Sequence, residues 1–489
     1  MEAEGKGVLV WRRVGLVLGP AVALTVALVP SALHRIPGLG ARPAYAAAIA
    51  LLMAIWWFSE ALPIAVTACV PLVTYPVFGV FGRGFWGDAR RAAEPFVDAY
   101  IFLFLGGMTL GAAMEQWGLH RRLALHIMKR IGTEPRRLLF GMLVATAAVS
   151  MWISNTATAV MMLPIGMALL RQLELARDGK RLGDFGASLM LAIAYASNVG
   201  GIGTKIGTGT NSIFVGFLSE KLGYDMSFVR YMAVGFPFVA LFIPLVWWVL
   251  WLNARGDLPE GSDSDAVLER ELALLGPWSR GERSVAAVFA AAALLWILGD
   301  PLRSWLTPPV QGFVPGTKLQ GKHHEATVAM LAAGVLVATR CVSFAQLRKV
   351  PWSTLLLLGG SFAMAAGIEG SGLSGFITLL LEPLARLPLA AQLAIATAAT
   401  VGLSAVASNT ATTVNLLLNV LPRSLPVLSA CAIAASCDFA LPAGTPPNAI
   451  VFGSGYIRLP QMMRTGFLLD LLAVVVIVLY TLAYLRFVV

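Results

Sequence analysis

The sequence is dominated by apolar runs about 20 residues long, separated by short polar loops. A run of this length crosses the hydrocarbon core of a bilayer as a helix, because backbone polar groups inside a membrane must bond to one another. Apolar residues make up 58% of the chain and charged residues 13%, a balance that does not describe a soluble core. We therefore predict an all-α polytopic membrane protein.

About 11 apolar runs have the length of transmembrane helices. The first follows Arg12 and Arg13, is long enough to span and lacks a small-residue cleavage site, so we expect a retained helix rather than a signal peptide. The predicted spans are residues 14–33, 44–60, 64–81, 97–115, 186–216, 230–253, 283–298, 325–340, 352–370, 424–453 and 464–487.

The formal net charge of +10 is distributed as in a membrane protein. Lysines and arginines gather in short loops between apolar runs, as the positive-inside rule requires of cytoplasmic loops. No basic helix with interleaved aromatic residues is present, so we expect a lipid bilayer as partner and no nucleic acid. The sequence indicates no organic cofactor.

One polar pentapeptide, Ser-Asn-Thr-Ala-Thr, occurs twice in apolar surroundings, at residues 154–158 and 408–412. Each copy follows a serine four residues upstream, Ser150 or Ser404. Polar residues inside a membrane are costly and mark functional sites. The duplication therefore predicts a binding site.

Two apolar stretches, 138–170 and 390–421, contain these copies near their middle. We expect the halves to be too short to cross about 30 Å of hydrocarbon and predict two re-entrant hairpins. Two predicted spans are also broken, by glycine-rich segments at 200–211 and by residues 444–448. Irregular backbone at this depth is tolerated where it lines a buried cavity.

The two halves of the chain read as one unit used twice. Each has a helix with a Gly-Gly pair, a surface segment, a hairpin and a span broken at Gly-Thr-x-x-Asn. The surface segment 118–137 carries six basic residues and its counterpart 372–388 only Arg386, so the copies are predicted to face opposite sides of the membrane. We predict an inverted repeat with a cytoplasmic N-terminus and an external C-terminus.

This repeat divides the chain into five parts. We expect N-terminal scaffold helices at 1–96, the first repeat at 97–253 with hairpin 138–170, a cytoplasmic loop at 254–282, scaffold helices at 283–351, and the second repeat at 352–489 with hairpin 390–421.

Inverted repeats with discontinuous helices are typical of secondary transporters. The second arm of each hairpin begins at the polar copy, so its free N–H groups and positive dipole end point at the protein centre. Two such ends suit an anion with two separated negative groups, such as a dicarboxylate. Amide and hydroxyl oxygens can coordinate Na⁺ while their hydrogens bind the anion, and Asn155 and Asn409 are the candidate bridges.

Three segments resemble the divalent anion/sodium symporter family: the duplicated Ser-Asn-Thr triplets, residues 444–452 and residues 56–63. The resemblance covers nearly all of 44–487 and implies transport of di- or tricarboxylates or sulfate, a homodimer, and an elevator-type movement of the hairpin-bearing domain. It implies substrate binding by Ser154, Asn155, Thr156, Thr208, Ser408, Asn409, Thr410, Thr445 and Pro446. It implies sodium binding by Ser150, Asn155 and the backbone near Gly207, and by Ser404, Asn409 and the backbone near Gly444.

Two ionisable residues depart from the family pattern at membrane depth. Lys205 stands where an apolar residue is common, and Asp438 follows Cys437 where small or apolar residues are usual. One hypothesis makes Lys205 a fixed cation that replaces a sodium ion; a second gives Asp438, paired with Lys205, a proton in each cycle. A third hypothesis gives Lys205 no part in transport: it extends to a surface, or it neutralises Asp438 in a purely structural ion pair.

The most economical interpretation is a secondary transporter in the inner (cytoplasmic) membrane that carries succinate, malate or fumarate with sodium. A sodium-independent exchanger that uses Lys205, a proton-coupled carrier and a sulfate carrier remain alternatives. An enzyme would need acid, base or nucleophilic groups at its centre, where this sequence places hydroxyls and amides. A channel would need a continuous polar path, which two hairpins meeting tip to tip would block.

Overall fold

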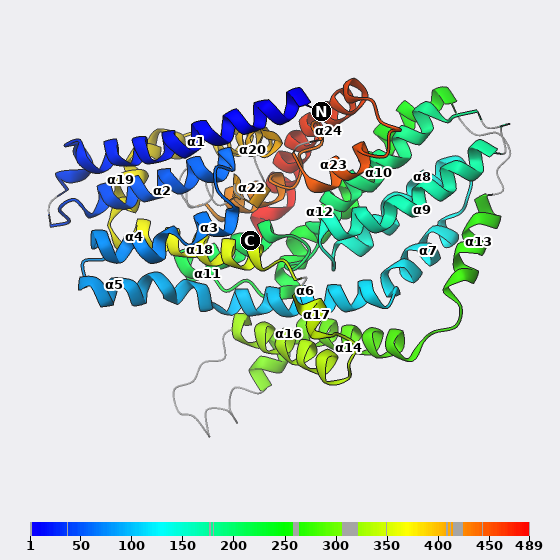
Figure 1. The fold of residues 1–489 in the computed structure, drawn as a ribbon, viewed down its shortest axis with the longest axis horizontal. Coiled ribbons are helices and arrows are strands. Elements are labelled where there is room, and N and C mark those ends of the chain that lie inside the picture. Colours follow the sequence, from blue (N-terminus) through cyan, green and yellow to red (C-terminus); the bar gives the residue numbers. More distant parts are fainter. Residues whose placement is uncertain are drawn as a thin grey trace.

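The computed structural model describes residues 2–36, 38–175, 178, 180–257, 264–305, 321–348, 350–406, 409–410, 412–413, 424–442 and 444–488. Within these ranges all regular elements are helices, as predicted from the apolar runs. Figure 1 shows them as a bundle in which the N-terminal helix α1 (Glu2–Leu28) lies along α2 (Arg42–Ser59).

The predicted span 64–81 is two short helices, α3 (Ile64–Ala68) and α4 (Val70–Phe78). Pro71 lies in the first turn of α4, where its missing N–H costs least. A further helix, α5 (Gly84–Ala93), follows and was not predicted, because its sequence is polar on one face and too short to span. A 3₁₀ turn, η2 (Glu94–Val97), leads from it into the first repeat.

Seven helices make up the first repeat. They are α6 (Ala99–Gln116), α7 (Leu119–Ile131), α8 (Pro135–Ser150), α9 (Asn155–Leu175), α10 (Gly183–Gly201), α11 (Gly209–Leu222) and α12 (Phe228–Ala254). The predicted hairpin is α8 with α9. By length and composition, α9 by itself could cross a bilayer, because it continues to Leu175. The expectation that both arms of the hairpin would be too short was therefore wrong for this arm.

The second repeat has the same order of helices in its described part. It contains α18 (Trp352–Gly370), α19 (Leu373–Ala385), α20 (Leu389–Val406), α22 (Leu425–Ala434), α23 (Pro446–Phe452) and α24 (Leu459–Tyr480), which a π turn (Thr481–Leu485) joins to α25 (Arg486–Val488). The return arm of hairpin 390–421 lies outside the described residues. In Figure 1, α7 lies at the right-hand end and its counterpart α19 at the left-hand end, the arrangement that an inverted repeat requires.

Helices α13 (Ser264–Leu275), α14 (Arg280–Ile297), α16 (Gly321–Ala338) and α17 (Phe344–Leu347) connect the repeats. α16 packs along α6. The contact depends on glycine, because a Cβ added to Gly106 would lie 2.5 Å from the Ala329 carbonyl oxygen.

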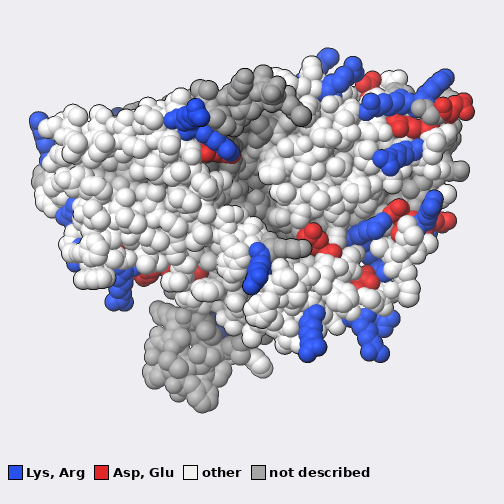
Figure 2. Space-filling model, in the orientation of Figure 1, with Lys and Arg blue, Asp and Glu red and all other residues white. Residues whose placement is uncertain are grey.

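Six described helices are long and apolar enough to cross a membrane, or up to seven if the bent pair Arg280–Ile297 and Gly299–Trp305 counts as one span. Several of the 11 predicted spans fail this test because the structure divides them into shorter helices. Figure 2 shows Lys and Arg, with several Asp and Glu, gathered at the end that holds α7 and α13 in Figure 1, beside a broad surface with few charges. The protein is a multi-pass membrane protein.

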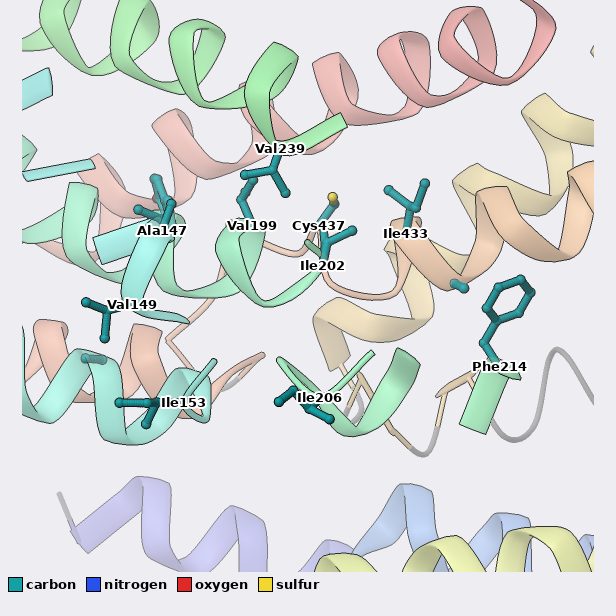
Figure 3. Packing of buried hydrophobic residues seen from close by; sticks show 14 of the residues in the cluster. Ala147, Val149, Ile153, Val199, Ile202, Ile206, Phe214, Val239, Ile433 and Cys437 are labelled. Carbon is teal, nitrogen blue, oxygen red and sulfur yellow. The ribbon is translucent and has the colours of Figure 1, made fainter. Parts of the chain in front are cut away.

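Helix α10 lies at the centre of the fold and is buried from Phe185 to Gly201. It packs against α8, α9, α12 and α23. Figure 3 shows Val199 and Ile202, at its C-terminal end, within the cluster of buried residues that includes Val239 of α12 and Cys437 after α22. Packed apolar side chains therefore surround the C-terminal end of α10, where the polar candidate site begins.

Candidate functional site

The corner of the first hairpin holds a serine and an asparagine against each other. Ser150 is the last residue of α8 and Asn155 the first of α9. The buried Ser150 Oγ lies 3.0 Å from Asn155 Oδ1 and 2.7 Å from the Ser197 carbonyl oxygen of α10. Because these two acceptors take up the single hydroxyl hydrogen, the Oγ lone pairs remain available to coordinate a cation.

The second hairpin repeats this geometry. Ser404 Oγ lies 3.0 Å from Asn409 Oδ1 and 2.8 Å from the Ala435 carbonyl oxygen, which follows α22. The structure thus brings together both Ser-Asn pairs that the sequence repeat singled out. Hydroxyl, amide and carbonyl oxygens are ligands suited to a hard cation.

Both broken spans are held by an asparagine. Asn211 Nδ2 donates to the carbonyls of Gly201 (2.8 Å) and Thr204 (2.7 Å), and Asn448 Nδ2 donates to those of Asp438 (3.3 Å) and Leu441 (3.0 Å). Each amide satisfies carbonyls that a helix break leaves without a helical partner. These asparagines end the Gly-Thr-x-x-Asn motif, but spacing alone did not reveal that they hold the break.

The two repeats meet at this point. Asn198 Nδ2 of α10 donates to Thr445 Oγ1 (3.0 Å) and Asn448 Oδ1 (3.4 Å) of the other repeat. A second contact joins the repeats, since a Cβ added to Gly209 would lie 3.7 Å from Thr410 Oγ1. These contacts join parts of the two repeats, and Asn198 takes part in them although its sequence context gave no signal.

The predicted substrate residues of the first repeat, and Thr410 of the second, differ in exposure. Ser154 and Thr156 are exposed, and Thr208 and Thr410 are half-buried. Ser154 Oγ accepts the Ala157 N–H at 3.4 Å, which leaves the preceding N–H groups at the start of α9 for a ligand.

The rest of the predicted substrate set belongs to the second repeat. Thr445 is buried, and its Oγ1 accepts the Asn448 N–H at 3.3 Å, while Pro446 beside it is exposed. Asn409 is half-buried. Ser408 lies outside the described residues.

Lys205 pairs with a residue that the sequence did not suggest. Its Nζ lies 2.6 Å from Glu325 Oε2 of α16, and both side chains are buried. Glu325 Oε1 also accepts the Phe228 N–H at 2.5 Å, and the Lys205 ammonium lies 5.7 Å from the centre of the Tyr100 ring. The predicted pairing of Lys205 with Asp438 was therefore wrong, since Glu325 neutralises this ammonium.

Asp438 instead contacts the second hairpin. Asn409 Nδ2 donates to Asp438 Oδ1 at 3.1 Å, and the aspartate side chain is buried. Asp470 of α24, for which the sequence offered no role, accepts the Phe439 N–H at 2.7 Å and so fixes the chain just after Asp438.

A family model described as "Sodium:sulfate symporter transmembrane region" matches residues 10–489. The chain is 34% identical to the sodium-dependent dicarboxylate transporter SdcS of Staphylococcus saprophyticus, over 98% of this chain and 92% of the relative. It is 33% identical to SdcS of Staphylococcus aureus (strain USA300), over 95% of this chain and 90% of the relative.

Among solved structures, the fold is similar to that of the Alcanivorax borkumensis YdaH transporter. The TM-score is 0.56 at 15% sequence identity, and the match covers 90% of this chain and 98% of the other. The resemblance read from the Ser-Asn-Thr triplets is confirmed by the family match over nearly the whole chain. This protein is a transporter rather than an enzyme, and it belongs to the divalent anion/sodium symporter family.

Proposed function

We propose that this protein carries C4-dicarboxylates of the succinate, malate and fumarate class across the cytoplasmic membrane together with sodium ions. The observation that supports the proposal is that two equivalent Ser-Asn corners, one from each repeat, lie beside helix breaks, and that α10 of one repeat contacts the break of the other. The naming of the Staphylococcus relatives as sodium-dependent dicarboxylate transporters supports it.

In the proposed mechanism each corner serves an anion and a cation at once. Ser150, Asn155 and the backbone near Gly207 hold one sodium ion, and Ser404, Asn409 and the backbone near Gly444 hold another. The asparagine oxygens face the serines, so the amide nitrogens can donate to substrate carboxylates. We assign substrate contacts also to the remaining predicted residues, of which Ser408 lies outside the described part of the chain: Ser154, Thr156, Thr208, Ser408, Thr410, Thr445 and Pro446.

Sodium lowers the cost of bringing a dianion to this depth. Bound monovalent cations would offset the charge of the two carboxylates, so substrate and sodium each bind more tightly when the other is bound. Coupling follows, because a carrier loaded with only one of them would leave uncompensated charge in a medium of low dielectric.

We further propose that the hairpin-bearing helices, α8–α11 in the first repeat and α20, α22 and α23 in the second, move against a static body in a homodimer. α6 packs along α16, so we assign both to the static body. The N-terminus and the charged end at α7 are proposed to be cytoplasmic and the C-terminus external.

The ion pair of Lys205 with Glu325 does not favour a sodium-independent exchanger, because the ammonium and the carboxylate 2.6 Å from it together carry no net charge that could balance a dianion. Sulfate is a weaker fit than a C4-dicarboxylate, since two corners from different repeats suit two separated negative groups.

Counterflow in proteoliposomes tests the proposal. Labelled succinate should enter vesicles that are loaded with unlabelled succinate, malate or fumarate. Sulfate should compete poorly with succinate for uptake. Replacing sodium by choline should abolish the uptake. Full succinate uptake in choline would contradict sodium coupling, and competition by sulfate alone would contradict the substrate class.

A further inference from the structure

The two cation sites of the proposed mechanism differ at one position in whether a charged side chain is present. Gly201 and Asp438 occupy equivalent positions, because the carbonyl of each accepts the amide of the asparagine that holds its break. In the first repeat a Cβ on Gly201 would lie 2.4 Å from Asn155 Oδ1, so there is no room for a side chain. In the second repeat the corresponding asparagine, Asn409, turns its Nδ2 to the Asp438 carboxylate at 3.1 Å.

The second oxygen of this carboxylate lacks a visible protein partner. Asp438 is 1% exposed, and its Oδ2 has no hydrogen-bond partner among the described residues. Within the same part of the chain, none of the ion pairs involves Asp438. A buried carboxylate without a counter-charge is strongly unfavourable, so Asp438 requires either a proton or a positive ligand.

The oxygen also points at a place where other oxygens converge. The three atoms nearest to the position of a Cβ on Gly444 are all oxygens: Asp438 Oδ2 at 2.7 Å, and the carbonyls of Ala405 and Leu441 at 3.5 Å each. Ala405 adjoins Ser404, whose hydroxyl faces Asn409. Oxygens clustered around one point, one of them charged, are the surroundings that a hard cation prefers.

We propose that Asp438 is a direct ligand of the cation bound at the second hairpin, so that this site carries a carboxylate while its counterpart in the first repeat is built from neutral oxygens. The inference rests on the proposed sodium coupling. It makes the two sites unequal: the second binds Na⁺ more tightly and binds it before the dicarboxylate arrives, because its charge does not depend on the substrate.

Sodium binding without substrate tests this inference. The thermal unfolding midpoint of the purified full-length protein in detergent is followed as NaCl replaces choline chloride at constant ionic strength. The wild type should be stabilised by Na⁺. Asp438→Asn should raise the Na⁺ concentration for half-maximal stabilisation at least about tenfold, since tenfold corresponds to about 1.4 kcal/mol, a small part of what a charged ligand contributes.

Asp470→Asn is the matched control, because it removes a carboxylate one helix away that contacts the Phe439 N–H. It should leave the Na⁺ response within about twofold of wild type. If Asp438→Asn does not yield folded protein, Gly444→Ala serves instead, since its Cβ would displace Asp438 Oδ2 without removing the charge. It should weaken the Na⁺ response in the same direction.

An unchanged Na⁺ response in Asp438→Asn would overturn the inference, and the same holds for Gly444→Ala where that variant is used. A wild type that Na⁺ does not stabilise would also overturn it. Succinate uptake by the wild type is measured separately. A protein that Na⁺ stabilises through Asp438 but that does not transport succinate would refute the proposed substrate and leave the cation ligand supported.

Discussion

Two asparagines, Asn211 and Asn448, hold the helix breaks on which the site depends. Asn211 Nδ2 bonds two buried carbonyls at 2.7 and 2.8 Å. Asn211→Ala should leave the Gly201 carbonyl without this partner, while the Thr204 carbonyl keeps its bond from the Gly207 N–H. It should lower the free energy of unfolding by about 1–3 kcal/mol, the cost of one buried unsatisfied group. Thermal unfolding of the purified protein measures the loss.

The control for this prediction is Asn253→Ala. Asn253 also donates a side-chain hydrogen bond, to Thr465 at 2.9 Å, but its partner is a single hydroxyl and the contact is only partly buried. We expect about 1 kcal/mol or less for this variant. Equal losses for the two variants would show that Asn211 does not hold the break.

The residues that sequence reasoning found and missed differ in a simple way. Ser150, Asn155, Ser404 and Asn409 are marked by a spacing that occurs twice, so their pairing could be predicted. Asn198 occurs once and gains its role only because α10 packs against α23. Such a contact depends on three-dimensional packing, about which local spacing carries no information.

Between elements, in the conformation that the structure shows, the buried ion pair of Lys205 and Glu325 joins the break after α10 to α16. Removing one partner leaves an uncompensated charge. Lys205→Met or Glu325→Gln alone should therefore cost about 3–5 kcal/mol of stability, whereas Lys205→Met combined with Glu325→Leu should recover most of it. Thermal unfolding of the three variants and succinate uptake by the double variant are the measurements.

The double variant also separates the two roles considered for Lys205. If the pair is structural, the double variant is stable and transports succinate with sodium. A stable double variant without transport would show that the lysine charge takes part in the cycle. The sequence could not predict this pair because its members are 120 residues apart.

At the scale of the whole molecule, the repeat was predictable and the number of spans was not. Helices α7 and α19 each follow a glycine in the left-handed conformation, Gly118 and Gly372, and both sequences repeat the same order of helix, surface segment and hairpin. Whether an apolar run is one helix or two depends on breaks such as that at Cys69, which local composition did not reveal. Similarly, the extension of α9 to Leu175 depends on its packing against α10 and α23.

The proposed movement of the hairpin-bearing helices against α6 and α16 predicts that a bond between the two bodies stops transport. A Cβ on Gly107 of α6 would lie 3.3 Å from Ile206 Cβ, in the break after α10, close to the Cβ separation of about 3.5–4.5 Å found in disulfides. Gly107→Cys with Ile206→Cys, in a background without the four native cysteines, should form a disulfide on oxidation.

Succinate uptake should fall to background when this disulfide forms and return on reduction, because the bond fixes one arrangement of the two bodies. Each single cysteine variant, treated with the same oxidant, is the control for damage by the substitution or by oxidation. Complete cross-linking with undiminished uptake would mean that Gly107 and Ile206 stay together throughout the cycle. The moving body would then include α6, and the boundary between the two bodies would have to lie elsewhere in the fold.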